Sequence, residues 1–299
     1  MKKHCLILLV LIFCSISGAK AQDLLSTLDE EEPSKEYIKN AFKSTRVIAS
    51  HSLEFLGPGV LDFRILHRFG RVNGGTYEAF GLDQARIRLG LDYGISKRLM
   101  VGLGRSSYKK ESDAFIKYRL IWQAKGKGGI PFSVILTSGM TNVGLKFENT
   151  EQKNYYTSRL GYYHQVIIGR KFSDAFSLQV MPTMVHRNLV AKSEDENDIY
   201  SCGVGARIKL SRRVAFTVDY YYQFPNQLPD DIQMPLSIGF DIETGGHVFQ
   251  LHFTNALGMN ERAIITETDG MWGKGDIHFG FNISRVFTVV KHKAGESKK

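Results

Sequence analysis

Charged side chains occupy every second position of several otherwise apolar segments, a spacing that could line a passage for polar solutes. Alternate residues of a strand point to the same side, so each such set shares one face. The set predicted to point into the interior of a closed sheet is Arg64, Arg86, Arg88, Asp92, Lys117, Arg119, Arg207, Lys209, Asp219, Asp241, Glu243 and Asp276. The basic members lie mainly before Leu210 and the acidic members mainly after it. Across an open lumen, these charges would create a field that orients small polar or ionic solutes, whereas pairing among them would form a structural core that plugs it.

Other residue types give no catalytic or metal site. His247 and His252 are five residues apart, so a strand points them to opposite faces, and no histidine pair has a nearby Cys or carboxylate at ligand spacing. The acidic run from Glu194 to Asp198 lacks calcium-loop spacing. The stretch from Gly104 to Ser107 lacks the second glycine of an esterase elbow, and Gly126 to Gly129 lacks the Ser or Thr of a phosphate loop. We therefore predict no catalytic residue, no metal and no cofactor.

One histidine keeps an enzymatic alternative open. His164 belongs to the side of its segment that would face lipid, and some outer-membrane barrels hydrolyse lipids with a Ser and a His on the barrel wall. A structural or interfacial histidine is the simpler explanation, so lipid hydrolysis is retained only as an alternative.

The elements that position these residues are strands. From Ala85 to Arg105, aliphatic residues alternate with Arg, Asp and Gly on both sides of a turn at Ser96 to Arg98, which predicts a hairpin. Further strands are predicted at Val60–Phe69, Asp113–Gln123, Phe132–Leu136, Leu160–Lys171, Phe176–His186, Tyr200–Leu210, Val214–Phe224, Leu236–Glu243, His247–Asn255 and Asp276–Phe287.

The connections between these strands distinguish a barrel from a sandwich. Long polar loops are predicted at residues 71–84, 141–155, 188–199, 225–234 and 256–275, and short turns lie between them. Outer-membrane barrels combine short periplasmic turns with long outer loops, whereas sandwiches need no such segregation. The pattern predicts an all-β protein, a closed antiparallel up-and-down transmembrane β-barrel.

Strand parity predicts the size of the barrel. With short turns below and a last strand that descends to the periplasm, counting from Val60 to Phe287 gives twelve strands. Residues 46–56 are left over. They could be a periplasmic or lumenal segment, or they could pair with Tyr37 to Lys43 and raise the number to fourteen; we favour twelve.

The ends of the chain suggest export. Lys2 and Lys3 precede the apolar run from Leu6 to Phe13, and small residues flank Lys20, which predicts a signal peptide over residues 1–21. We predict a flexible N-terminal segment at 22–45, the β-barrel at 46–289 and a basic C-terminal tail at 290–299. Removal of the signal peptide leaves Cys202 as the single cysteine and excludes an internal disulfide.

Charge and location bound the partners. The formal net charge of +9 is spread through strands and turns rather than clustered, so we expect no nucleic-acid partner. The expected partners are outer-membrane lipid, the barrel-insertion machinery through the closing aromatic Phe287, and a periplasmic protein that could contact residues 22–56.

Several motifs also resemble a known family. They are His67–Gly70, Phe80–Asp83, Arg88–Gly94, Gly102–Ser107 and Gly280–Phe287. Together they resemble a family of β-barrel proteins of unknown function from Bacteroidetes, over about residues 46–287. The resemblance implies a barrel in the outer membrane of a Gram-negative envelope, and it implies no activity or site residue.

Three functions follow from these observations. The leading hypothesis is a passive, narrow outer-membrane channel or transporter for small polar solutes, with the lumenal charges as its selectivity element. The alternatives are a structural or partner-binding barrel without transport and an outer-membrane lipid hydrolase.

Overall fold

The computed structural model describes residues 34–147, 153–190, 192, 194–244 and 247–290. The expected signal peptide, the first half of the expected N-terminal segment (residues 22–33) and nearly all of the C-terminal tail lie outside the described residues, so those assignments stay predictions.

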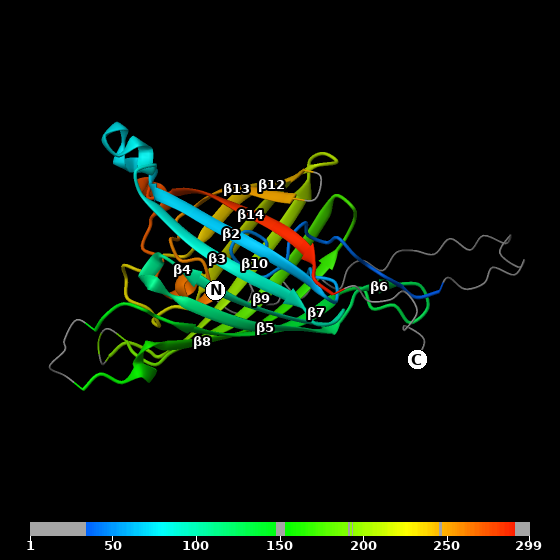
Figure 1. Ribbon diagram of the computed structural model, residues 1–299, viewed down its shortest axis with the longest axis horizontal. Coiled ribbons are helices and arrows are strands. Elements are labelled where there is room, and N and C mark those ends of the chain that lie inside the picture. Colours follow the sequence, from blue (N-terminus) through cyan, green and yellow to red (C-terminus); the bar gives the residue numbers. More distant parts are fainter. Residues whose placement is uncertain (1–33, 148–152, 191, 193, 245–246, 291–299) are drawn as a thin grey trace, which may run out of the picture.

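Twelve antiparallel strands form the wall, and the first wall strand pairs with the last to close it. They are β2 (Val60–Arg71), β3 (Ala85–Gly94), β4 (Leu99–Ser106), β5 (Ser112–Ile121), β7 (Ser133–Asn142), β8 (Leu160–Lys171), β9 (Phe176–Arg187), β10 (Asp198–Lys209), β11 (Val214–Gln223), β12 (Leu236–Thr244), β13 (His247–Thr254) and β14 (His278–Thr288). The strands follow chain order around the ring (Figure 1). The prediction of a closed twelve-stranded barrel is confirmed.

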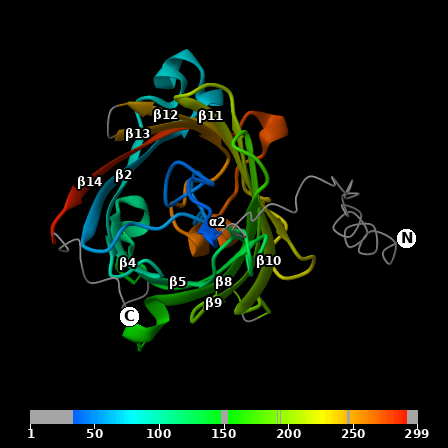
Figure 2. The same cartoon turned by 90° about the vertical axis from the view of Figure 1, so that its right-hand side faces the viewer.

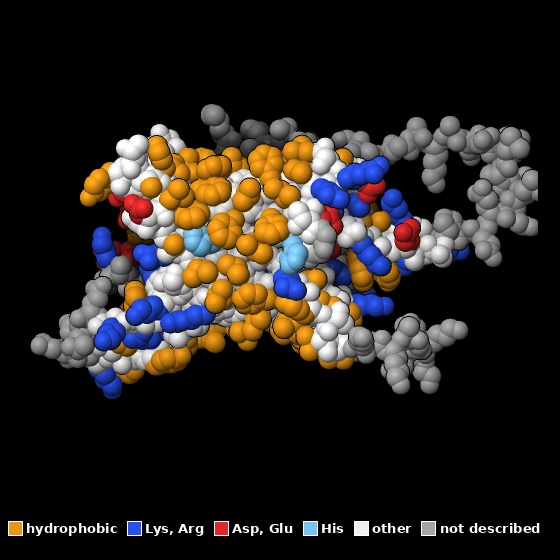
Figure 3. Space-filling view, turned by 45° about the horizontal axis from the view of Figure 1, so that its top comes forward, with side chains coloured by type: hydrophobic (Ala, Val, Ile, Leu, Met, Phe, Trp, Pro, Cys, Tyr) orange, Lys and Arg blue, Asp and Glu red, His pale blue; other side chains and the backbone are white. Residues whose placement is uncertain are grey.

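The alternating sequence pattern determines which way each strand faces. In β3, Leu89 and Leu91 are exposed on the outside, whereas Arg88 and Asp92, which flank them, are buried inside. Figure 3 shows the result on one face of the molecule, a broad belt of hydrophobic side chains with charged groups gathered toward its two ends. An apolar exterior around a polar interior is the arrangement of a barrel whose outside is solvated by lipid.

The two ends of the barrel differ in their connections. Residues 95–98, 172–175 and 210–213 form short turns at one end, here called the turn end, and the predicted long loops lie at the other, the loop end (Figure 1). The loop end carries five short 3₁₀ helices: η1 (Val72–Gly74), η2 (Thr76–Gly81), η3 (Tyr108–Lys110), η4 (Tyr156–Arg159) and η5 (Trp272–Lys274). One connection breaks the rule, since residues 122–132 form a long link at the turn end.

This long link anchors the chain before it enters the barrel. It contains β6 (Ala124–Lys125), which pairs with β1 (Glu36–Tyr37) in a small two-stranded sheet outside the wall. Beyond β1 the chain runs into the ring of strands, where Figure 2 shows the N-terminal segment in blue inside the barrel.

Residues 41–56, here called the plug segment, lie in the lumen. Ala41, Phe42, Val47 and Leu53 are all buried there. The wall therefore begins at Val60 rather than at residue 46. Residues 46–56 add no strand pair because their backbone groups bond to lumenal side chains instead of a neighbouring strand, so the fourteen-stranded alternative is not formed.

A second element enters the lumen from the loop end. The β13–β14 connection, expected as an outer loop, carries α2 (Glu261–Thr266), all six residues of which are buried, and Figure 2 shows it within the ring. Asn260 caps the helix, because its side chain accepts a hydrogen bond from the Ala263 N–H at 3.0 Å. No helix among the described residues is long and apolar enough to cross a membrane.

Candidate functional site: a filled lumen

Polar wall side chains hold the backbone of the plug segment. Asp219 accepts hydrogen bonds from the N–H groups of Ala49 and Ser50 at 3.1 and 2.8 Å, and from the Ser50 hydroxyl at 2.7 Å. Side-chain amides from three other strands donate to plug carbonyls: Gln179 to His51 at 2.7 Å, Gln250 to Val47 at 2.6 Å and Asn282 to Ile48 at 2.9 Å. The segment is thus tied to strands on several sides of the ring.

Basic side chains make the same kind of contact near the turn end. Lys117 Nζ donates to the Glu54 carbonyl at 2.7 Å and Arg119 Nη2 donates to the Leu53 carbonyl at 3.1 Å. Arg64 Nη2 donates to the Thr45 hydroxyl at 2.7 Å. These cations were predicted to line a pore; in the structure they bind the segment that fills it.

Glycines in the wall make room for the plug segment. A Cβ atom on Gly205 of β10 would lie 3.0 Å from Val47 Cγ2, and one on Gly169 of β8 would lie 2.8 Å from Leu53 Cδ1. Both glycines occupy inward positions of their strands. Side chains at these positions would occupy space that the segment now fills.

The plug segment also contacts α2. Arg46 Nη1 donates to Glu261 Oε1 at 3.2 Å, and the His51 N–H donates to the same oxygen at 3.2 Å. Burial raises the pKa of Glu261 against the opposing effect of Arg46. Burial and the nearby cations Arg46 and Lys117 hold the pKa of His51 well below its ordinary value. The plug segment and α2 are therefore joined by polar contacts inside the ring.

A second ion cluster fixes α2 to the wall at the loop end. Arg262 donates from Nη2 to Glu111 at 2.6 Å and from Nη1 to Glu267 at 2.6 Å. Arg68 of β2 donates to the Ala256 carbonyl at 2.7 Å. These contacts hold α2 and its loop against the wall at the loop end.

Most predicted pore-lining residues do face the interior. The buried members are Arg64, Arg88, Asp92, Lys117, Arg119, Arg207, Asp219 and Asp241. Arg86 and Lys209 are exposed near strand ends, and Glu243 lies half-buried near the turn end, where it pairs with Lys43. Asp276 precedes β14 and accepts from Asn73 Nδ2 at 2.8 Å outside the lumen. Its strand was predicted two residues too long, because residues 269–277 turn outward before pairing begins at His278.

Two of the predicted basic residues form ion pairs with acids near them on the wall. Arg88 of β3 reaches over Gly104 of β4 to Asp113 of β5, with Nε 2.8 Å from Oδ1. Arg64 pairs with Asp62 on its own strand at 2.8 Å. Asp62 and Asp113 were not among the predicted pore-lining residues, although the same alternation places them on the inward face. The lumenal position of Glu261 and Arg262 could not be predicted in this way, because both belong to a connection without a strand period.

Polar atoms without partners remain at the centre. Both carboxylate oxygens of Asp92, Nη1 of Arg88, and Nε and Nη2 of Arg46 are buried and lack a hydrogen bond in the described part of the chain. Buried polar groups of this kind are suited to bind water or a small polar solute.

A pair of polar side chains lies on the outward face of β7 and β8. His164 of β8 lies directly opposite Ser138 of β7, and its Nδ1 is 2.9 Å from the Ser138 hydroxyl. In the described ranges, no three His, Cys, Asp or Glu side chains are grouped to hold a metal ion.

A closed barrel with an apolar exterior and a polar interior defines a transmembrane β-barrel, the class of protein found in bacterial outer membranes. The chain belongs to the family described as the membrane bound beta barrel domain (DUF5777), whose model matches residues 42–287. The match begins inside the plug segment, so this segment is part of the family's domain. The protein is therefore an outer-membrane β-barrel.

Solved barrels with similar architecture have little sequence identity to this chain. The NanC porin is 8% identical, with 76% of this chain and 98% of that chain covered and a TM-score of 0.47. An active-site variant of outer membrane phospholipase A from Escherichia coli is 10% identical, with 81% and 96% covered and a TM-score of 0.45. The COG4313 outer membrane channel from Pseudomonas putida is 12% identical, with 78% and 97% covered and a TM-score of 0.42. None of the curated protein sequences matches this chain.

Proposed function

We propose that this protein is a gated outer-membrane channel for small polar solutes, in which the plug segment closes the lumen. One observation carries the proposal: polar wall side chains bond to the backbone of a segment that is not itself part of the wall. The bonds from neutral amides contribute only about 0.5–1.5 kcal/mol each, and those to the Asp219 carboxylate about 1.5–3 kcal/mol each, because water can replace them. A plug held in this way can leave without breaking the barrel.

Displacement of the plug segment would expose the predicted selectivity elements. Lys117, Arg119 and Asp219 all bond to the segment in the closed state. Eight-stranded barrels are filled by side chains and barrels of about sixteen strands leave an aqueous channel, so twelve strands suit a narrow pore. Charged groups in such a pore select small polar or ionic solutes.

Conductance in planar bilayers tests the proposal. We expect the wild-type protein to be mostly closed and a variant without residues 41–56 to conduct steadily. Folding of each variant is checked by heat-dependent migration in detergent gels. A correctly folded deletion variant that passes no current would contradict the channel and favour a structural or partner-binding barrel.

A second candidate function, lipid hydrolysis, rests on the contact between Ser138 and His164 on the exposed wall. Two features oppose it: the contact uses Nδ1, and the backbone N–H groups around it belong to paired strands, which leaves no oxyanion donors. Mutual satisfaction of two polar groups in lipid accounts for the pair. Hydrolysis of a fluorescent phospholipid by the wild type, lost in both Ser138→Ala and His164→Ala, would establish the enzyme.

The remaining parts of the proposal concern origin and partners. The motifs between residues 46 and 287 support an origin in Gram-negative Bacteroidetes. Phe287, exposed near the end of β14, supports recognition by the barrel-insertion machinery. A periplasmic protein would contact the chain at β1, since β1 pairs with β6 outside the wall at the turn end.

A further inference from the structure

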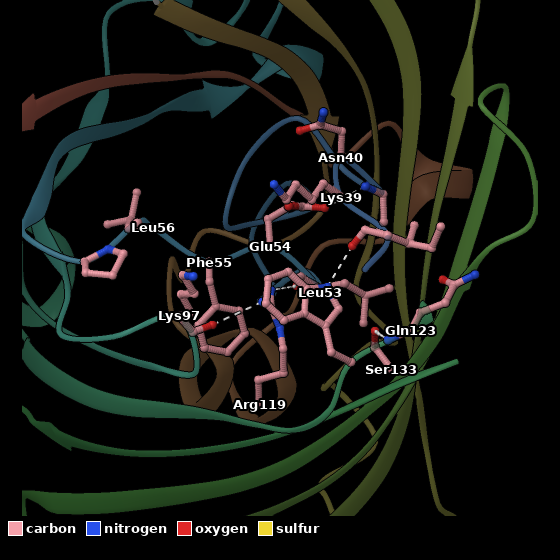
Figure 4. Close-up of a pocket in the computed structure, with 15 residues that line it drawn as sticks. Lys39, Asn40, Leu53, Glu54, Phe55, Leu56, Lys97, Arg119, Gln123 and Ser133 are labelled. Carbon is pink, nitrogen blue, oxygen red and sulfur yellow. Dashed lines mark hydrogen bonds between the residues drawn. The ribbon is translucent and has the colours of Figure 1, made fainter. Parts of the chain in front are cut away.

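A cavity of about 320 Å³ lies at the turn end, where the chain enters the lumen. Figure 4 shows that residues of the entering chain, Lys39 and Glu54, line it together with Lys97 and Arg119 of the wall. Its volume lies at the lower end of the range for small-molecule sites.

The charge of this cavity is not neutralised. Three of its lining residues are cations (Lys39, Lys97 and Arg119), and one, Glu54, is an acid. Glu54 is already engaged, since its Oε1 accepts hydrogen bonds from the N–H groups of Ala41 and Phe42 at 2.6 and 3.2 Å. Neither Lys39 nor Lys97 forms an ion pair with a described residue.

Arg119 is held rigidly, and its Nε lacks a partner among the described residues. Its guanidinium lies between the rings of Phe55 and Trp122, 4.2 and 3.9 Å from their centroids. Nη1 donates to the Lys97 carbonyl at 3.2 Å and Nη2 to the Leu53 carbonyl at 3.1 Å, whereas Nε is buried and has no partner. Because the guanidinium is preorganised, an incoming anion would order few additional groups.

A neighbouring cavity of about 600 Å³ adds to the positive field. It shares Lys39, Lys97 and Trp122 with the first and is also lined by Lys35, Lys125 and Lys171. Lys171 pairs with Asp174 at 2.8 Å. Its five lysines exceed its two acids, Glu36 and Asp174, and such an excess of positive charge concentrates anions.

We propose that the cavity at Lys39, Lys97 and Arg119 binds a small dianion, a phosphate ester or a dicarboxylate. Two ammonium groups supply the compensating charges, and a charge-assisted hydrogen bond from Arg119 orients one anionic oxygen. The labelled residues that line the cavity lie within the ring of strands (Figure 4), on the side away from lipid, so the proposed ligand is a soluble anion and not a lipid headgroup. A dianion bound there bridges the entering chain and the wall.

Trp122 provides a direct readout of binding. It lines both cavities, whereas Trp272, the second of the two tryptophans, lies at the loop end. In a Trp272→Phe background, titration with inorganic phosphate or succinate at constant ionic strength should change Trp122 emission saturably, and sodium chloride should not.

Matched lysine variants test the location of the site. Lys39→Gln and Lys97→Gln should each weaken binding at least about tenfold, since each removes one charge-assisted contact. Lys274→Gln, an exposed lysine at the loop end, should bind as the parent does. Absence of a saturable signal, an affinity in both lysine variants equal to that of the parent, or a signal only with phosphatidylglycerol micelles would each overturn the proposal. Because binding is measured without current, its failure is distinguishable from failure of the gated channel.

Discussion

Ser50 presents both its backbone N–H and its hydroxyl to the carboxylate of Asp219, at 2.8 and 2.7 Å. The serine belongs to the plug segment and the aspartate to β11, 169 residues further along the chain. A single wall side chain thus makes two of the contacts that close the lumen.

Asp219→Asn should loosen the plug segment while leaving the wall intact. The substitution keeps the size of the side chain but removes the charge that strengthens three hydrogen bonds. With hydrogen bonds to charged groups contributing about 1.5–3 kcal/mol, the closed state should lose about tenfold or more in occupancy. Single-channel recordings measure this as more frequent opening. Asp174→Asn, in an exposed turn, is the control and should not change gating. Unchanged opening in Asp219→Asn would mean that this carboxylate does not hold the closed state.

Gly205→Leu should displace the plug segment by filling its place. A leucine there would overlap Val47 and force the segment outward, because the inward face of β10 offers no other space. We expect steady conductance from a barrel that still shows heat-dependent gel migration. The control is Gly273→Leu, because a Cβ atom at Gly273 meets no other atom within 4 Å. A folded, closed Gly205→Leu protein would contradict the assigned position of Val47.

The ion cluster that fixes α2 should show strong coupling between its members. Arg262→Met leaves Glu111 buried without its cation, which should cost about 3–5 kcal/mol of unfolding free energy. The double variant Glu111→Gln with Arg262→Met should lose less than the sum of the two single variants. Guanidinium unfolding in detergent micelles, followed by fluorescence, measures all three. Additive losses would show that the pair does not interact.

Acid should weaken the ion cluster of Glu111, Arg262 and Glu267, because it protonates Glu267. Burial alone would raise the pKa of this carboxyl, but the cations Arg262 and Lys109 hold it below its ordinary value of 4.5. A carboxyl whose folded pKa is depressed stabilises the fold above its unfolded pKa, and this contribution is lost as the pH falls through the folded pKa. The difference in stability between wild type and Glu267→Gln should therefore be constant near neutrality and shrink below pH 4.5. A difference that does not depend on pH would refute the assignment.

The wall could be predicted from the sequence because its signal is local. Alternation over two residues is visible within Ala85–Arg105 alone, and it correctly separates Arg88 and Asp92, inside, from Leu89, outside. Strand number followed from the same signal together with loop length.

The contents of the lumen could not be predicted in this way. The plug segment has no clear period, and its partners Gln179, Asp219, Gln250 and Asn282 are distributed over four strands distant in sequence. Six residues of helix in a polar loop carry no amphipathic pattern, so α2 was read as an outer connection. The alternation gave the direction of the charged residues but not the pairing of Arg88 with Asp113 across β4.

The position of the seam in the wall bears on how the protein assembles. β2 and β14 are the strands that meet to close the ring. The plug segment is separated from β2 only by residues 57–59, and α2 lies in the connection that leads directly into β14. The two strands that must pair to close the barrel are thus each joined to a lumenal element: β2 to the plug segment and β14 to α2. Sealing of the wall and delivery of its contents are therefore one event in the maturation of this protein.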